Sequence, residues 1–305
     1  MWQRLFQRLG FVVEKMVLCP RGSSASLMLA DLEALFASNL QVIMRTAIRD
    51  QPLNSPRRSV SSMGEAEAFL ASLDLDLTDV IAQEQLPLEW SCELYVTADA
   101  GLLEIVPGIW GTGANQLPDA IELRRDGARR PVRRRAEQWE VSSLDGTGQL
   151  RTVTRPPISD EQLGVVAAAC QERWDVLDAI RRRLVDPFHL YFQTFDGGRV
   201  SWQNVREMAT TLELDKVRST VPGPYFVVRQ RQDVERWDGA QALLFAVSAE
   251  RSALAALIDC VDALKARGAT SVAVANGVLS HQAILLREAG MVTTAPDAVS
   301  SERAP

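Results

Sequence analysis

The sequence has few cysteines and no long apolar run, and each shortage excludes a class of protein. Polar or charged residues interrupt every apolar stretch well short of the roughly 18–20 residues that a membrane span needs, and the N-terminus lacks the apolar core of a signal peptide. The cysteines lie far apart and form no CxxC pair, which argues against structural zinc and favours isolated buried thiols. We therefore expect a protein of the reducing cytoplasm without a membrane partner. The four cysteines are Cys19, Cys92, Cys170 and Cys260.

The chain also lacks an excess of basic residues. Its 33 lysines and arginines face 39 aspartates and glutamates, so the net charge is −6, and we expect no nucleic-acid partner. Apolar residues at 47% and charged residues at 24% are ordinary globular usage and exclude wholesale disorder. At about 100–200 residues per domain, the 305 residues suggest two domains.

Apolar periodicity and turn signals predict helices and strands over the first two-thirds of the chain. Ser61–Glu65 and Ser159 have the residue types of helix N-caps, and the Pro, Asn and Ser content of residues 50–58 indicates a loop. The predicted helices are 25–37, 61–73 and 159–183, and the predicted strands are 41–46, 79–84, 92–98 and 101–106, with a hairpin of 189–195 and 200–205.

The most basic segment lies between residues 124 and 135. Such a run is usually the solvated face of a hairpin, and we favour that interpretation over contact with phosphate, which is the alternative. Its arginines are Arg124, Arg125, Arg129, Arg130, Arg133, Arg134 and Arg135.

A second unit begins after Val221–Pro224, a cluster of breakers that is suited to a linker. Strands and helices alternate beyond it, and this order predicts a small α/β domain with parallel strand pairing. The predicted strands are 225–230, 242–247 and 271–275, and the predicted helices are 250–267 and 280–289.

The segment from Gly277 to Gly290 carries the strongest chemical signal. A strand ends at the Gly277 turn, and Ser280 can cap a helix whose first turn holds His281. Unpaired N–H groups and the helix dipole favour an anion there, which suits a histidine that accepts a phosphoryl group. The alternative is a histidine in the capping region with no role.

The pattern Gly-x-x-Ser-His-x-Ala-Ile-x-x-Arg-Glu-x-Gly in this segment resembles the phosphohistidine motif of the phosphoenolpyruvate-utilising enzymes. These include phosphoenolpyruvate synthase, pyruvate phosphate dikinase and rifampicin phosphotransferase. The resemblance implies that His281 is the phosphorylated histidine of a mobile, swivelling domain. Leu279 stands where the family usually has Thr, and Met291-Val292 where Ile-Pro is usual. A domain that keeps the fold without the reaction is the alternative.

The first two-thirds of the chain resembles the ATP-grasp nucleotide-binding domain of the same family. Residues 9–13 resemble its early Gly-x-x-Val-Pro strand without the proline, and residues 42–47 resemble its Val-Arg-Ser-Ser segment. The resemblance implies that Arg45 contacts ATP phosphates, a task that suits an always-charged guanidinium. An arginine that pairs with a carboxylate at a strand end is the alternative.

Two further segments resemble the nucleotide site. Residues 81–86 resemble the hinge strand that contacts adenine, which makes Gln83 and Glu84 the adenine-edge candidates; an ordinary strand end is equally compatible. Residues 103–111 resemble the Glu-x-x-x-Gly-x-Gly strand and loop near the phosphates, and this implies an ATP-binding role for Glu104.

The metal site of the family is where the chain departs most from the pattern. The family's glutamate position falls at Phe192 or Gln193, and Asn204 stands where the family has Gln, although Arg206 matches its arginine. Magnesium is usually held by one or two carboxylates with phosphate oxygens. The weak candidate ligands Gln193 and Asn204 carry no charge, so we expect weakened Mg²⁺ binding, or a site that borrows Glu104 or Glu207.

The resemblance covers about residues 9–295 and predicts an α/β fold class. The family's upstream Gly-Gly-Lys element and its phosphoenolpyruvate/pyruvate-binding barrel have no counterpart here, so we expect that the chain does not function by itself. The expected partner is ATP together with an unknown phosphoryl acceptor or a partner subunit, and the sequence leaves open whether a partner chain supplies the missing parts. The predicted parts are an α+β ATP-grasp-like domain over 1–215, a linker over 216–224, a small α/β swivelling domain over 225–295 and a flexible tail over 296–305.

The leading functional hypothesis is an ATP-dependent phosphotransferase with a phosphohistidine intermediate. ATP would phosphorylate His281, with Arg45 and Arg206 on the transferring phosphate, and the acceptor is unknown. One alternative is a binding or assembly protein that kept both folds and lost catalysis. A less favoured alternative is an ATP-grasp ligase that joins a carboxylate to an amine, which leaves His281 unexplained.

Overall fold

The chain forms two compact units in the computed structural model. The first unit comprises Gln3–Pro87 and Ser143–Arg151, and the second comprises Leu88–Ser142 and Thr152–Pro305. The predicted linker and tail fall largely on residues outside those described, so the predicted domain boundaries stay predictions. The structure describes residues 2–37, 41–48, 56–85, 88–108, 117–133, 139–144, 150–184, 188–195, 199–207, 212, 214, 224–247 and 254–296.

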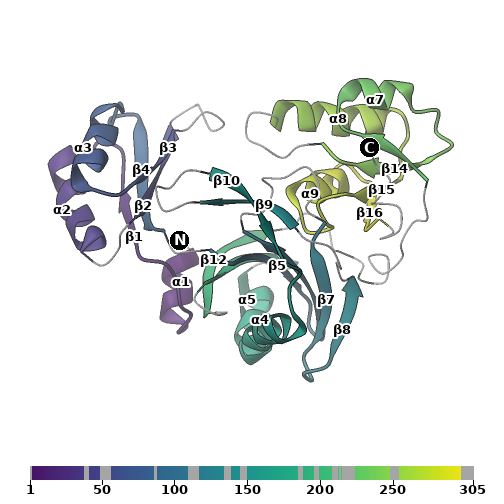
Figure 1. The fold of residues 1–305 in the computed structure, drawn as a ribbon, viewed down its shortest axis with the longest axis horizontal. Coiled ribbons are helices and arrows are strands. Elements are labelled where there is room, and N and C mark those ends of the chain that lie inside the picture. The colour runs from purple at the N-terminus through teal and green to yellow at the C-terminus, as the bar shows by residue number, and fades with distance from the viewer. Residues whose placement is uncertain are drawn as a thin grey trace. The chain divides into compact units, whose positions relative to one another are not determined.

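The first unit is built on a four-stranded antiparallel sheet with the order β1-β4-β2-β3. Helices α2 and α3 pack together on one face of this sheet (Figure 1). Met28 and Leu32 of α2 are buried with Val42 and Met44 of β2, and they form the core of the unit. The elements are α1 (Trp2–Arg8), β1 (Met16–Cys19), α2 (Ala25–Phe36), β2 (Val42–Ile48), β3 (Arg57–Val60), α3 (Met63–Ala71) and β4 (Thr78–Glu84).

The predicted helices and strands of this unit are confirmed, and two details are corrected. A strand over residues 9–13 is wrong, because Gly10 has a φ of +77° in the turn that follows α1 and the first strand begins only at Met16. The predicted loop over 50–58 is wrong at its end, because Arg57 and Arg58 pair with β2. Residues 49–55 lie outside the described residues.

The ion pair between Arg21 and Asp79 should make the stability of this unit depend on pH in the acid range. The backbone N–H of Arg21 and its guanidinium donate to Asp79 at 2.8 and 2.7 Å, and these bonds hold the pKa of Asp79 below its usual range. The stabilisation that these bonds contribute is therefore complete above the ordinary aspartate pKa of about 4. It is lost as the pH falls through the lowered pKa of Asp79 in the folded protein.

We expect Asp79→Asn to cost up to about 1 kcal/mol at pH 7, since the pair is partly exposed. The difference in urea midpoint between wild type and variant should shrink below pH 4. A difference that stays constant down to pH 2 would contradict this assignment.

The second unit contains a six-stranded antiparallel sheet with the order β12-β11-β5-β6-β7-β8. It confirms the predicted strands over 92–98 and 101–106 and the hairpin of 189–195 and 200–205. The strands are β5 (Trp90–Val96), β6 (Ala100–Pro107), β7 (Asp119–Arg124), β8 (Arg129–Arg133), β11 (Phe188–Phe195) and β12 (Arg199–Glu207). A separate two-stranded sheet of β9 (Trp139–Leu144) and β10 (Leu150–Arg155) includes residues of both units.

The two faces of the six-stranded sheet differ in chemistry. Residues opposite one another in an antiparallel pair point to the same face of the sheet, so the register shows which side chains share a face. One face carries Leu94, Phe192 and other apolar side chains, and helices α4 and α5 lie on the sheet (Figure 1). The opposite face carries buried polar and charged side chains, including Glu93 and Glu104, which lie directly opposite each other. We call it the polar face.

The single helix predicted over 159–183 is wrong, because two helices occupy this stretch. Ser159 and Gln162 form the capping box that starts the first helix, as the sequence indicates. At Arg173 the backbone has φ −102° and ψ 5° and leaves the helical path, and the next residue, Trp174, is buried. The helices are α4 (Asp160–Glu172) and α5 (Trp174–Leu184).

The last part of the second unit confirms the predicted small α/β arrangement. Four strands pair in parallel in the order β13-β14-β15-β16, and helices α7, α8 and α9 connect them. Phe245, Leu257, Val274 and Leu286 are among the buried residues of its core. The elements are β13 (Tyr225–Val228), α7 (Arg231–Arg236), β14 (Ala242–Phe245), α8 (Leu254–Ala266), β15 (Ser271–Val274), α9 (His281–Glu288) and β16 (Val292–Thr294).

Sequence patterns missed α7 and β16. Thr293 and Thr294 of β16 are 3% and 4% exposed, and their strand pairs with β15. Gly290, with a φ of +93°, ends α9 and turns the chain back towards the sheet, which makes this pairing possible.

All four cysteines are buried free thiols, as predicted. They lie in the separate elements β1, β5, α4 and α8. None of the helices among the described residues combines the length and the apolar character that crossing a membrane requires.

Candidate functional site

His281 is the first residue of α9, as the motif predicts. Ser280 caps the helix by accepting a hydrogen bond from the N–H of Ala283 at 3.3 Å, and its own hydroxyl donates to the carbonyl of Gly277 at 2.8 Å. The His281 side chain is exposed. The local sequence therefore produces an accessible imidazole at the positive end of a helix.

The turn before His281 is held by Glu104 of β6. One carboxylate oxygen of Glu104 accepts from the N–H of Val278 at 3.1 Å and the other from the N–H of Leu279 at 2.8 Å. Gly277 has a φ of +91°, and a Cβ at this position would lie 2.5 Å from Pro118 and 2.6 Å from Glu104. The turn approaches the sheet so closely that only glycine fits there.

Arg133 of β8 completes the surroundings of Glu104. Its Nη2 lies 3.1 Å from the carboxylate, and its Nε donates to the carbonyl of Pro118 at 2.7 Å. Burial raises the pKa of Glu104 above its usual range, although Arg133 and the two turn N–H groups act in the opposite direction. The position of the turn thus depends on a buried, hydrogen-bonded ion pair.

Arg287, the arginine of the phosphohistidine-like motif, holds the turn from the other side. Its Nη1 donates to the carbonyl of Val278 at 2.6 Å and to the hydroxyl of Thr293 at 2.9 Å. Burial lowers the pKa of Arg287 to about 10, and the nearby Glu104 carboxylate opposes that shift. The structure therefore gathers Glu104, Arg133 and Arg287 around one turn, which we call the Gly277–Leu279 turn.

The structure places Glu104 at this turn, where both its oxygens are engaged. An ATP-binding role for Glu104 stays a prediction, and it would require these bonds to be exchanged for bonds to the nucleotide. The separation in sequence is 174 residues between Glu104 and Val278, so no local pattern could have indicated the contact.

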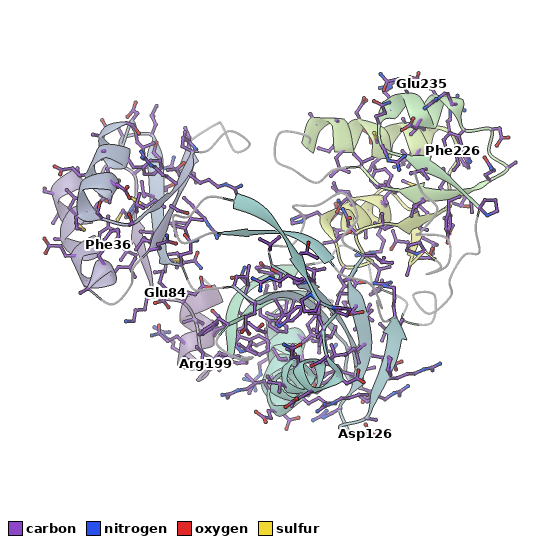
Figure 2. The ribbon with its side chains drawn as sticks, in the orientation of Figure 1. Phe36, Glu84, Asp126, Arg199, Phe226 and Glu235 are labelled. Carbon is purple, nitrogen blue, oxygen red and sulfur yellow. The ribbon has the colours of Figure 1, made fainter. Side chains whose placement is uncertain are left out.

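Arg45, Gln83 and Glu84 lie in the first unit. Arg45 is exposed on β2, opposite Ile81 of β4, and alternation places Arg45 and Gln83 on the same face of the sheet, away from its core. The Gln83 amide is buried and donates to Glu14. Glu84, labelled in Figure 2, ends β4 and accepts from the N–H of Lys15 at 2.8 Å. Their contacts with ATP stay predictions.

Of the two candidate metal residues, Gln193 lies on the polar face of the second unit, opposite Ser91 of β5. The Gln193 amide donates to the Tyr191 hydroxyl at 2.6 Å, and burial raises the pKa of Tyr191 to about 12. Asn204 and Arg206 lie opposite Tyr191 and His189 in the β11–β12 register, but their side chains and that of Glu207 lie outside the described residues. Among the residues that the structure describes, no group of three or more His, Cys, Asp or Glu side chains could hold a metal ion.

Sequence reasoning missed two residues of the polar face. His189 and Glu93 are 0% and 3% exposed, and the His189 Nε2 contacts the Glu93 carboxylate. The signal was present as alternation, because Ser91, Glu93 and Tyr95 take every second position of an otherwise apolar strand. Such a pattern indicates a strand with one apolar face and one polar face.

The basic segment forms the β7–β8 hairpin, with Asp126 in its turn (Figure 2). Arg124, Arg125, Arg129 and Arg130 are exposed, which confirms the prediction of a solvated hairpin face. Arg133 departs from it, because its side chain is only 8% exposed beside Glu104. Arg134 and Arg135 lie outside the described residues.

No family model and no curated protein matches the chain. Similar solved structures include a D-alanine–D-alanine ligase from Bacillus anthracis complexed with ATP, at 10% identity over 66% of this chain and 52% of that chain, with a TM-score of 0.35. An N5-carboxyaminoimidazole ribonucleotide synthetase in complex with ADP matches at 12% identity over 67% and 43%, with a TM-score of 0.36. The ATP-grasp ligase PsnB, complexed with a minimal precursor, matches at 13% over 67% and 50%, with a TM-score of 0.33. The aligned region spans about half the length of each of these proteins.

Proposed function

We propose that this chain is an ATP-grasp-like nucleotide-binding protein that acts through binding or assembly and has lost magnesium-dependent catalysis. The observation that carries the proposal is that Glu104, a carboxylate that a metal site would have to borrow, already serves the protein itself. Both oxygens of Glu104 accept hydrogen bonds from the Gly277–Leu279 turn, and the remaining candidate ligands Gln193 and Asn204 carry no charge. The segments that resemble the ATP-grasp pattern at residues 42–47, 81–86 and 103–111 coincide largely with strands β2, β4 and β6, which supports the nucleotide-binding part.

Calorimetry with ATP tests both parts of this proposal. We expect ATP to bind with a Kd that changes less than about threefold between excess Mg²⁺ and excess EDTA. Arg45→Ala should weaken ATP binding roughly tenfold or more, the effect of losing one charge-assisted phosphate contact. Arg58→Ala is the matched control, because the side chain at this neighbouring exposed position of the same sheet points to the other face. Tight binding that requires Mg²⁺ would contradict the loss of catalysis, and an absence of ATP binding would contradict the whole proposal.

The phosphotransferase is the second candidate, and the exposed His281 at the start of α9 is the observation that favours it. The chain has two histidines, and the other, His189, is fully buried, so any phosphohistidine formed on the folded protein is assigned to His281. Incubation with ATP and several divalent metals, followed by intact-mass analysis at neutral pH, would detect it.

We expect no acid-labile phosphoryl adduct in wild type. An adduct that disappears in His281→Asn would establish phosphotransfer in place of the binding role. ATP consumption with a carboxylate and an amine that survives His281→Asn would instead indicate ligase chemistry through an acyl phosphate.

A further inference from the structure

The Gly277–Leu279 turn and two buried arginines gather hydrogen-bond donors near one carboxylate. The N–H groups of Val278 and Leu279 and the Nη2 of Arg133 donate to Glu104. Arg287 lies close enough to Glu104 for the carboxylate to favour its charged form. All of these groups are buried.

Further donors at this turn have no hydrogen-bond partner among the described residues. They are Nη1 of Arg133 and both Nε and Nη2 of Arg287. The Arg133 side chain is 8% exposed and Arg287 is 7% exposed, so the unpaired groups belong to side chains that are more than nine-tenths buried. A buried donor without an acceptor is destabilising, and more so when it is charged, so such groups indicate that an acceptor belongs there.

The number of donors does not match one carboxylate. Arg133 bonds to Glu104 and Arg287 interacts with its charge, and the turn and the two arginines offer six donors when the unpaired ones are included. A carboxylate offers about four lone-pair sites on two oxygens. A phosphate group offers three strong acceptor oxygens and close to two negative charges at neutral pH, with a second pKa near about 6.

We propose that the Gly277–Leu279 turn, Arg133 and Arg287 form a phosphate-binding site, and that the Glu104 carboxylate occupies it in this structure in place of phosphate. The backbone N–H pair supplies two aligned donors, and the arginines supply the charge. A phosphate that enters displaces Glu104 from the turn. Occupancy of the site therefore competes with the contact between the turn and β6.

Removal of the resident carboxylate tests the site with inorganic phosphate as the probe and without nucleotide, so the result does not depend on the proposed ATP binding. Glu104→Ala leaves the donors in place and vacates the acceptor. We expect saturating phosphate to raise its thermal unfolding midpoint by about 5–10 °C relative to chloride at equal ionic strength. In wild type, where Glu104 occupies the site, the same exchange of salts should shift the midpoint by less than about 2 °C.

The matched control is Glu122→Ala, which removes another buried carboxylate of the polar face that pairs with Arg124 at 3.1 Å. This control variant should gain no phosphate-specific stabilisation.

Adding Arg287→Met to Glu104→Ala should abolish the rise in unfolding midpoint that phosphate causes in Glu104→Ala. If Glu104→Ala does not fold, Glu104→Gln removes the charge at nearly constant size and should show the same phosphate dependence. Equal shifts in the Glu104 and Glu122 variants, or no phosphate-specific shift in either Glu104 variant, would overturn the proposal.

Discussion

Gly277→Ala is expected to lower the free energy of unfolding by about 3–5 kcal/mol. Two costs add up at this position. A φ of +91° is unfavourable for alanine by about 1 kcal/mol. The added methyl carbon would also lie 2.5 Å from Pro118 and 2.6 Å from a Glu104 oxygen, so Glu104 would have to leave one or both turn N–H groups. Hydrogen bonds to a charged group contribute about 1.5–3 kcal/mol each.

Gly290→Ala is the matched control for this prediction. Its φ of +93° is nearly the same, and an added Cβ would meet nothing within 4 Å. We expect a loss of about 1 kcal/mol from backbone strain alone. Urea unfolding followed by far-ultraviolet circular dichroism measures both variants. Equal losses would mean that the close approach of the turn to Glu104 contributes nothing to stability.

Trp174→Ala is expected to cost about 3–5 kcal/mol, the usual range for truncating a large buried aromatic side chain. Trp174 begins α5, is 2% exposed and donates from its indole to the carbonyl of Ala98 at 3.4 Å. Its ring also lies against Gly101 of β6, where an added Cβ would lie 2.9 Å from it. Truncation would therefore leave a cavity between α5 and the apolar face of the six-stranded sheet.

Two companion variants separate the sources of this loss. Trp174→Phe keeps an aromatic ring and removes the indole donor, so we expect it to recover at least half of the lost stability. Val165→Ala truncates a residue of α4 that is 44% exposed and should change stability by less than about 0.5 kcal/mol. The measurement is again urea unfolding. A Trp174→Ala loss below about 1.5 kcal/mol would show that the sheet and helices close over the cavity.

The helix caps were determined by the sequence alone, because capping is a contact between residues three apart. Ser62, Ser159 and Ser280 cap helices through the N–H groups of Glu65, Gln162 and Ala283. The same local physics placed the strands, since alternation and turn residues act over a few positions. The small parallel α/β arrangement followed from the order of these elements.

The role of Glu104 was decided only by the tertiary structure. A glutamate in an apolar strand indicates a special position, and the resemblance assigned it to ATP, but its partners lie 174 and 175 residues further along the chain. Arg133 belonged to a basic run that is exposed at its other described positions, and only the β7–β8 register turns it towards the polar face. The break at Arg173 and the burial of Thr293 likewise depend on distant packing. Local sequence thus determined the helix caps and the positions of the predicted strands, whereas the pairing of buried charges required the assembled sheet, because burial fixes which charged groups must meet.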